Sequence, residues 1–529
     1  MKKVFLLITA MLLHLHVQAD TWDGSASDKS WYEETRTEFH IYSAAQLKGL
    51  ADIVNEGIST FKDAIFYLEN DIDLGNHPWI PIGYGNYNPK YFCGTFNGND
   101  HSITNLYIST NKLTGTYFST GLFGNTENSL FLNLHIQGRI EHDSTHGIGS
   151  YLGGLVGDCR NGKIENVRCK IDLSIISNGS WGLGGDNCYY GFVAGYATTI
   201  SKVYSEGTLS FTNCGTTSGN FGGITGRAGN IEECHSNTQM IIPHSDSYGN
   251  APSIGGIAGY VDNSVKNSIF TGSISVNYYG GKNCYTGGIC GMGETGIKIE
   301  NVIAAPSYFY SYAQAFYTCL INRSAAPVVQ YAYFADTFAG SYETYGTAVS
   351  EDYLKSGAIL SGFDTNIWEF KSGRYPRLKS LIPTYSINAP TEHGSIAYCV
   401  TEGGEAKIKI NSNQDWEIDK VFVNQMDVTT QMNGNMLIFE DIQENKDLFI
   451  VYKQTANSVR SLQQNVSFNI SRSAEGFLVS GIQTGKSIAV YDLNGIELIR
   501  QSSNGANCFR LSKGLYIVTA CGQSKKVSF

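Results

Sequence analysis

A glycine-framed pair of apolar residues recurs through the first half of this chain and constrains its fold more than any other feature. The frames close at Gly124, Gly157, Gly195, Gly226, Gly259 and Gly291. Successive closing glycines are 31 to 38 residues apart. Such a period is typical of solenoids, in which each unit buries its apolar face only against its neighbours. The repeat therefore predicts a rod of stacked coils.

A tetrapeptide led by an apolar residue follows each frame and predicts a strand. Its third residue is asparagine in five of seven copies, at Asn105, Asn133, Asn166, Asn267 and Asn301. Asparagine tolerates left-handed backbone angles and can bond to its counterpart one coil away, so this column predicts a ladder at a turn. Seven coils stacked about 4.8 Å apart would give a rod of roughly 34 Å.

The N-terminal end of such a rod needs a cover, because open strand edges invite aggregation. Ser43 and Gln46 have the spacing of a capping box, and Gly57 is a helix stop signal. Four apolar residues between these signals share one helical face: Leu47, Leu50, Ile53 and Val54. We therefore expect an amphipathic helix over the first coil.

The composition is that of a turn-rich and aromatic-rich β protein. Among 529 residues, 42% are apolar and 16% are charged, with 59 glycines, 33 tyrosines and 26 phenylalanines. The net charge is −10, without a basic stripe that would favour phosphates, so nucleic acid is not an expected partner.

The first 19 residues predict a secretory signal peptide. Lys2 and Lys3 precede an apolar run over residues 4–13, and a small-residue site ends at Ala19. Asp20 follows in place of a lipid-bearing cysteine, and no later run has the roughly 20 apolar residues of a membrane span. We expect an exported chain that is secreted or attached to the cell surface or outer membrane.

The twelve cysteines fall singly, without the paired spacing of a zinc site. Cys234 aligns with Val167, Val203 and Val302 of other repeats, an inward strand position. Buried free thiols are therefore favoured for most of them, although disulfides stay open in an exported chain.

After about residue 305 the repeat fades, and from residue 383 the chain becomes more charged and poorer in glycine. Asn494-Gly495 predicts a tight hairpin near the C-terminus. The predicted organisation is a signal peptide over 1–19, a capped solenoid over 20–381, a small β-rich domain over 382–454, a linker over 455–472 and a β-sandwich over 473–529.

The N-terminal motifs together resemble the GLUG-motif family of bacterial surface proteins over about residues 36–381. The resemblance is carried by Asn70-Asp-Ile-Asp-Leu74, Trp79-Ile-Pro-Ile-Gly83, Gly94-Thr-Phe-Asn-Gly98 and the frames that follow. It implies a right-handed parallel β-helix, usually in adhesin-like or cell-surface proteins. The segments 363–370 and 374–378 resemble the closing strand pair of such helices. The expected fold is all-β, a right-handed parallel β-helix with an N-terminal capping helix and two small β-sandwich-like domains.

Two further resemblances concern the C-terminal part. Gly394-Ser-Ile, Lys420-Val-Phe-Val-Asn and Asp427-Val-Thr are similar to small repeat modules of internalin-type surface proteins, which implies a spacer. The segments 488–495 and 511–518, followed by Lys525-Lys-Val, resemble the C-terminal sorting domain of type IX secretion in Bacteroidetes. That resemblance implies recognition by secretion machinery and passage across the outer membrane. Whether the tail is then removed stays open.

The usual catalytic signatures are missing from the sequence. His142 and His146 lie four apart in a glycine-flanked loop without the glutamate of a zinc protease, and neither a nucleophile elbow nor a phosphate-binding loop is present. No metal or cofactor is expected. Glycan cleavage is the enzymatic alternative, as a polysaccharide lyase or glycoside hydrolase with Asp158, Asp186 and Asp262 on adjacent coils. Asp71 and Asp73 are expected to orient turns.

Binding is the favoured function, because aromatic clusters interrupt the coils in inserted loops. The candidate binding residues are Tyr84, Tyr87, Tyr91, Trp181, Tyr189, Tyr190, Tyr278 and Tyr279. Flat amphipathic rings suit sugar faces and protein hot spots, although any one of them can instead belong to the core. The sequence thus predicts an adhesin-like protein that binds glycans or host or bacterial surface proteins. A purely structural surface component is a further alternative.

Overall fold

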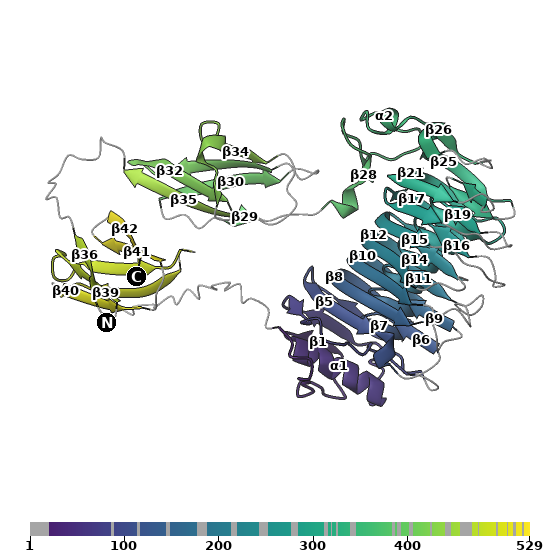
Figure 1. The fold of residues 1–529 in the computed structure, drawn as a ribbon, viewed down its shortest axis with the longest axis horizontal. Coiled ribbons are helices and arrows are strands. Elements are labelled where there is room, and N and C mark those ends of the chain that lie inside the picture. The colour runs from purple at the N-terminus through teal and green to yellow at the C-terminus, as the bar shows by residue number, and fades with distance from the viewer. Residues whose placement is uncertain are drawn as a thin grey trace, which may run out of the picture. The chain divides into compact units, whose positions relative to one another are not determined.

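The computed structural model divides the chain into two compact units, Met1–Ile382 and Pro383–Phe529 (Figure 1). The residues described are 21–85, 89–113, 117–143, 149–176, 188–212, 219–242, 252–276, 284–311, 316–318, 320–323, 326–338, 345–382, 387–388, 393–400, 406–423, 426–439, 446–454, 468–473, 476–493, 496–504, 506–511, 515–520 and 523–528. The predicted signal peptide and most of the predicted linker lie outside them.

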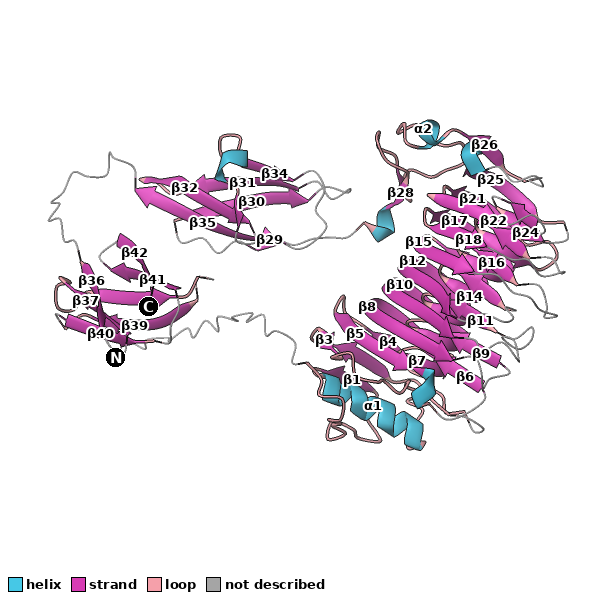
Figure 2. Ribbon diagram, in the orientation of Figure 1, coloured by secondary structure: helices cyan, strands magenta, loops and turns pink. Residues whose placement is uncertain are grey.

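The first unit is a parallel β-solenoid of about six turns, which confirms the predicted β-helix (Figure 2). Its larger sheet has 19 strands. They are β1 (Glu38–Ile41), β2 (Ile65–Leu68), β3 (Ile72–Asp73), β4 (Thr95–Asn97), β5 (Ser102–Ser109), β7 (Phe123–Glu127), β8 (Leu130–Asp143), β10 (Val156–Ile176), β12 (Ala194–Thr212), β14 (Thr225–Glu232), β15 (His235–Ile242), β17 (Ala258–Phe270), β18 (Ser273–Val276), β20 (Cys290–Gly293), β21 (Lys298–Ala304), β22 (Tyr308–Ser311), β24 (Ile321–Arg323), β25 (Val328–Ala335) and β26 (Thr347–Val349).

A second sheet of seven short parallel strands runs along another side of the solenoid. It contains β6 (Tyr117–Thr120), β9 (Gly149–Leu152), β11 (Tyr189–Gly191), β13 (Asn220–Gly222), β16 (Ser253–Gly255), β19 (Tyr285–Gly287) and β23 (Phe316–Thr318). Six of these strands, all except β23, lead through a glycine frame into a strand of the larger sheet. The frames require glycine because the coils approach closely there: a Cβ on Gly223 would lie 2.1 Å from the carbonyl oxygen of Gly256, one coil further on.

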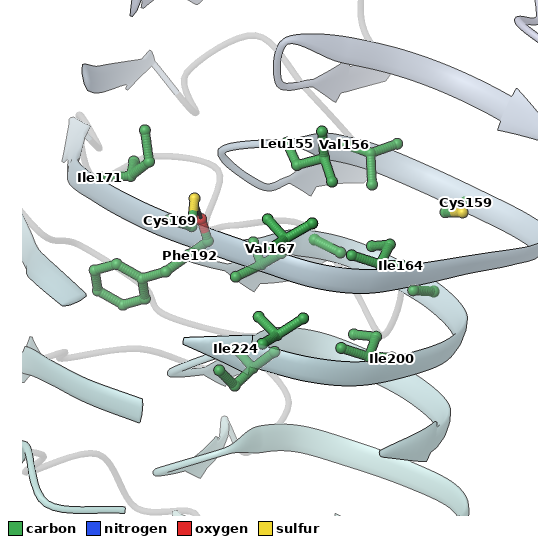
Figure 3. Close-up of a cluster of buried hydrophobic side chains, with 14 of the residues drawn as sticks. Leu155, Val156, Cys159, Ile164, Val167, Cys169, Ile171, Phe192, Ile200 and Ile224 are labelled. Atoms are coloured by element: carbon green, nitrogen blue, oxygen red, sulfur yellow. Dashed lines mark hydrogen bonds between the residues drawn. The ribbon is translucent and has the colours of Figure 1, made fainter. Parts of the chain in front are cut away.

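The interior of the solenoid is apolar and continuous from coil to coil. Val156, Ile164 and Val167 of β10 share it with Leu155 and Ile200 of neighbouring segments (Figure 3). Each of these five side chains is fully buried. Because every coil contributes the same inward positions, burial of the repeat's apolar residues stabilises the stack as a whole.

The asparagine column forms the predicted turn. All five asparagines have positive φ, between 45° and 55°. The side-chain amide of Asn166 donates to Asn133 Oδ1 (2.7 Å), and that of Asn133 donates to Asn97 Oδ1 (3.0 Å). Within the predicted column, Asn133 and Asn166 therefore bond to each other across neighbouring coils, whereas the side chain of Asn105 donates to Asp73 Oδ1 instead.

The first strand seed departs from the predicted alignment. Ile103 pairs with Ile136, whereas Phe131 pairs with Phe96 of the preceding strand β4. An additional turn with Asn99 at φ 52° separates β4 from β5 and offsets the seed. The first seed is therefore out of line with the later ones, although its strand still pairs with β8. The solenoid has about six turns, whereas the sequence predicts seven.

Helix α1 (Ala44–Glu56) covers the N-terminal coil, as predicted. Ser43 Oγ accepts from the backbone N–H of Gln46 (3.3 Å), and the Gln46 side chain accepts from the N–H of Tyr42 (2.8 Å). Gly57 ends the helix at φ 77°. The buried residues of α1 include the four predicted ones, Leu47, Leu50, Ile53 and Val54.

The residues after the last coil form a strap along the flank of the solenoid, which we define as residues 350–381. It contains α2 (Glu351–Leu354), β27 (Trp368–Glu369), β28 (Arg377–Leu378) and a short 3-10 turn (Lys379–Leu381). The antiparallel pair β27 and β28 matches the predicted closing strands. The pair does not simply close the last coil, because the Arg168 guanidinium of β10 donates to the Leu381 carbonyl oxygen, in the middle of the stack.

The strap covers outward apolar residues of the late coils. Trp368 is 1% exposed, its ring centroid lies 5.0 Å from that of Phe363, and its indole N–H lies 3.4 Å from Asn267 Oδ1. Ile269 and Ile303 belong to the same buried cluster. From Tyr333 on β25 to Arg168 on β10 the strap spans five strand spacings, or about 24 Å.

The cysteines with described positions in the solenoid are mostly buried free thiols, as favoured from the sequence. Six are at most 1% exposed: Cys159, Cys169, Cys188, Cys234, Cys284 and Cys290. Burial raises the pKa of the Cys159 and Cys234 thiols to about 12. We expect these six to escape alkylation by iodoacetamide in the native chain and to react fully after unfolding, because the thiolate is the nucleophile. Peptide mapping by mass spectrometry measures the alkylation of each cysteine, and labelling of any of the six in the native chain would contradict the prediction.

The second unit contains two small sandwiches, each with its own core. The first pairs β29 (Ile387–Asn388), β35 (Lys446–Gln454), β32 (Trp416–Val423) and β33 (Met426–Asp427) in one sheet and β30 (Gly394–Val400), β31 (Ala406–Ser412) and β34 (Met436–Phe439) in the other. The second has β36 (Asn469–Ser473), β37 (Gly476–Ser480) and β40 (Ala506–Arg510) facing β39 (Glu497–Ser502), β38 (Ser487–Tyr491), β41 (Leu515–Ala520) and β42 (Gln523–Ser528). Both sheets of each sandwich contribute to its buried cluster.

Neither α1 nor α2, the α-helices of the described residues, has the length and apolarity that a bilayer span requires.

Candidate functional site

The residue after each closing glycine lies on one outward column of the larger sheet. The column contains Asn125, Asp158, Tyr196, Arg227, Tyr260 and Met292, which are in register on successive strands. All are half-buried except Asp158, which is buried. Because the frame glycines carry no side chain, the neighbouring strands of the second sheet bring their own outward residues against this column.

Two tyrosines of the second sheet contact the column. Tyr151 and Tyr189 pair across β9 and β11, with ring centroids 5.1 Å apart. The Tyr189 ring lies 6.3 Å from that of Tyr196, and its hydroxyl accepts from Arg227 (3.3 Å) on the next coil. Side chains of the two sheets therefore form one continuous surface across several coils.

We name this surface the tyrosine–arginine stripe. It consists of Tyr151, Asp158, Arg160, Tyr189, Tyr196, Arg227, Tyr260, Asp262 and Glu294. The stripe spans five consecutive coils, from β10 to β20, so that its length along the solenoid is about 19 Å.

Arg227 holds the centre of the stripe. Its guanidinium donates twice to Asp262 Oδ1, at 2.9 and 2.7 Å, and lies over the Tyr260 ring at 4.7 Å from the centroid. The Tyr260 hydroxyl in turn donates to Glu294 (2.8 Å). Burial and this carboxylate raise the pKa of Tyr260 to about 12, so the phenol stays neutral. Such ion pairs and cation–π contacts fix the orientation of the rings.

Asp158 lies at the other end of the stripe, 3% exposed. Its Oδ2 accepts from Arg160 Nε (2.8 Å), and its Oδ1 has no hydrogen-bond partner among the described residues. Burial raises the pKa of Asp158 to about 6, against the opposing effect of Arg160. Burial, with Asp158 as a second cause, also raises the pKa of Tyr151.

The structure brings one of the predicted binding residues into the stripe. Tyr189 is a member of it, although only 6% exposed. Tyr91 lies near the edge of the stripe, close enough to Arg160 to affect its pKa. The charge of Asp158 is the main cause that raises the pKa of Arg160, and Tyr91 adds a weaker contribution. Tyr84 is half-buried at the first coils, where its backbone N–H donates to Asn55 Oδ1 (2.8 Å).

Tyr190 belongs to the core rather than to a binding surface. It is 1% exposed and its ring stacks on that of Phe221 with centroids 5.0 Å apart. The reason is the alternation of a strand: Tyr189 points outward, so its neighbour points inward. The other predicted residues, Tyr87, Trp181, Tyr278 and Tyr279, lie outside the described residues.

The carboxylates considered for catalysis are separated. Asp158 lies on β10, and Asp262 lies on β17 with β12 and β14 between them, so their strands are about 14 Å apart. That exceeds the roughly 10 Å over which two carboxylates act on one glycosidic bond. Asp186 lies outside the described residues.

Asp71 and Asp73 orient turns, as expected. Asp71 Oδ1 accepts from the backbone N–H of Ser102 (2.8 Å). Asp73 Oδ1 accepts from the N–H of Gly75 and from the side-chain amide of Asn105, both at 2.8 Å. Both carboxylates thus have a structural role within the first coils.

His142 and His146, the histidine pair noted in the sequence, are not seen together at a metal site in the described part of the chain. His142 is 1% exposed and packs beside Tyr190, with ring centroids 5.9 Å apart. His146 lies outside the described residues. No group of three or more potential metal ligands occurs within the part of the chain that the structure describes.

Comparison of the chain with protein-family models, with curated proteins and with solved structures finds no match. A β-helix fits an adhesin and a lyase alike. The fold alone therefore does not distinguish between these two functions.

Proposed function

We propose that this chain is a noncatalytic binding protein whose solenoid presents the tyrosine–arginine stripe to a glycan. The observation that carries the proposal is the line of tyrosine and arginine side chains from consecutive coils, held by their mutual contacts. Rings held in place lose little conformational entropy when a ligand binds, and they offer flat apolar faces together with polar edges.

The spacing of the stripe supports a glycan ligand. Successive coils place equivalent positions about 4.8 Å apart, close to the length of one sugar unit in an extended chain. Hydroxyl groups of a sugar can donate to carboxylates and accept from guanidinium groups, and both occur in the stripe. Weak contacts on several coils would act together through effective concentration.

The proposal includes an exported, adhesin-like setting. It is supported by the signal-like residues 1–19, by the resemblance to GLUG-motif surface proteins and by the sorting-like C-terminal sandwich. The first sandwich of the second unit would then be a spacer, and the last would be recognised by secretion machinery.

Replacing Tyr151 or Tyr260 by alanine is expected to weaken glycan binding roughly 5- to 30-fold each, as loss of a binding aromatic costs about 1–2 kcal/mol. Both residues are half-buried members of the stripe. A glycan array followed by isothermal titration with the best ligand measures the effect. Tyr260→Phe keeps the ring but loses the 2.8 Å bond to Glu294, so its loss should be smaller.

Tyr42→Ala is the matched control, because Tyr42 is 53% exposed beside the N-terminal helix, away from the stripe. It should bind as the unaltered chain does. Equal affinity of Tyr151→Ala, Tyr260→Ala and the unaltered chain would rule out the stripe as the binding surface. Release of unsaturated uronate or reducing ends would instead favour a glycan-cleaving enzyme.

A further inference from the structure

The charges of the stripe are already compensated within it. Arg227 is bound to Asp262 at 2.7 Å, and Arg160 is bound to Asp158 at 2.8 Å. Each arginine therefore has a carboxylate partner before any ligand arrives, and an anionic ligand would have to compete with that carboxylate.

The stripe as a whole carries a small negative excess. It has two cationic groups, Arg160 and Arg227, and three carboxylates, Asp158, Asp262 and Glu294, which leaves −1 at neutral pH. Glu294 is the most exposed of the three, at 51% of its side chain, and lies 4.0 Å from the Arg227 guanidinium. An acidic polysaccharide lying along the stripe would bring its carboxylates or sulfates against this group.

Like charges brought together in a contact surface repel each other, and this repulsion serves to exclude a partner. An uncharged polysaccharide meets no such penalty, because its hydroxyl groups can donate to carboxylate oxygens and accept from arginine and tyrosine donors. The tyrosine rings contribute apolar contact in either case. The charges thus separate two ligand classes that the aromatic residues alone would accept equally.

We infer that the ligand of the stripe is an uncharged polysaccharide rather than a polyuronate or a sulfated glycan. The inference rests on the proposed function and narrows it. It also bears on the lyase alternative, because β-elimination needs a uronate, whose carboxylate acidifies the proton that is removed.

Affinity electrophoresis of the full chain with matched polysaccharides tests this inference. The probes are hydroxyethylcellulose, laminarin and galactomannan as neutral chains, and carboxymethylcellulose, alginate and polygalacturonate as acidic ones. We expect retardation by at least one neutral polysaccharide, with acidic chains at least about tenfold weaker. The neutral affinity should change little between 0.05 and 0.5 M salt, because screening acts on charge pairs.

The outcomes separate this inference from the proposed function. Retardation only by acidic chains, lost in Tyr260→Ala and weakened by salt, would overturn the uncharged ligand and leave the binding function standing. Retardation that persists in both Tyr151→Ala and Tyr260→Ala would contradict the proposed function. Circular dichroism of each variant confirms that the solenoid is intact. Absence of retardation by all six polysaccharides would contradict both.

Discussion

Trp368→Ala is expected to destabilise the solenoid by about 3–5 kcal/mol, the range for removing a large buried aromatic side chain. Trp368 is 1% exposed and packs on Phe363 within the cluster that covers Ile269 and Ile303. Loss of the indole leaves a cavity under the strap and also removes its contact with Asn267. Urea unfolding of the full chain measures the loss, and hydrogen exchange locates it on β17 and β21.

Trp416→Ala provides the matched control. Trp416 stacks on His393 with ring centroids 3.7 Å apart, but it belongs to the second unit. Its loss should leave exchange in the solenoid unchanged. If Trp368→Ala shifts the unfolding free energy by less than about 1 kcal/mol and protection of β17 is retained, the strap does not stabilise the late coils.

Acidification from pH 7 to 4.5 is expected to cost the solenoid about 2–3 kcal/mol through His142 alone. Burial lowers the pKa of this 1%-exposed histidine to about 4, from 6.5. The unfolded chain therefore takes up the proton first, so the contribution of His142 is complete above pH 6.5 and declines as the pH falls towards 4. Each pKa unit corresponds to about 1.36 kcal/mol. Urea midpoints across this range measure the slope.

Two variants isolate this contribution. His142→Gln should flatten the pH dependence of stability between pH 6.5 and 4.5. Burial raises the pKa of Asp158 to about 6, so the stability that this group contributes is lost as the pH rises through 6 and regained on acidification. In the unaltered chain this gain offsets part of the loss from His142. Asp158→Asn removes the offset and should therefore steepen the pH dependence of stability. A pH slope that is unchanged in His142→Gln would show that the imidazole is already protonated in the folded chain.

His235 contributes to the loss of stability on acidification in the same direction. It is half-buried, and its Nε2 lies 2.8 Å from Thr271 Oγ1. Burial above all, with the charges of Arg168 and Arg377, lowers its pKa to about 4. Protonation of His235 would add a third positive charge beside Arg168 of β10 and Arg377 of the strap.

The coil architecture could be predicted because it depends on local and repeated signals. Glycine at the frames, asparagine at the turn and the caps of α1 each require a particular backbone geometry, and each recurs or stands at a fixed offset. The one misplaced seed, at Ile103, looks like the others in sequence. Its offset depends on a turn at Asn99 that interrupts the repeat, and a pattern of apolar residues does not report such an insertion.

The stripe could not be predicted from the aromatic clusters of the inserted loops, on which the predicted binding residues were based. Its signal is instead the residue after each closing glycine, which reads Asn, Asp, Tyr, Arg, Tyr and Met from Asn125 to Met292. Taken one repeat at a time, these six residues share no chemistry that would mark them as a site. Only stacking in register shows that Arg227 meets Tyr189 and Asp262 of neighbouring coils. The same alternation explains why Tyr190 is core.

The strap left a detectable signal in the outward column that it covers. That column reads Arg168, Tyr204, His235, Ile269 and Ile303 on successive strands. The change from polar residues to isoleucine indicates a covered surface on the late coils. Neither the segment that covers this surface nor the direction in which it runs could be predicted from the sequence. The strap contacts the coils through side chains and has no repeat of its own.

The strap also decides where mechanical load enters the solenoid. The chain leaves the first unit at Ile382, directly after Leu381, which is bound beside β10 in the middle of the stack rather than at its last turn. A force applied through the second unit would first have to break the contact between Leu381 and Arg168, and then the packing of Trp368 on the flank, before it acted on the terminal coil. The end of the rod is thereby shielded from tension, and the flank acts as its point of attachment.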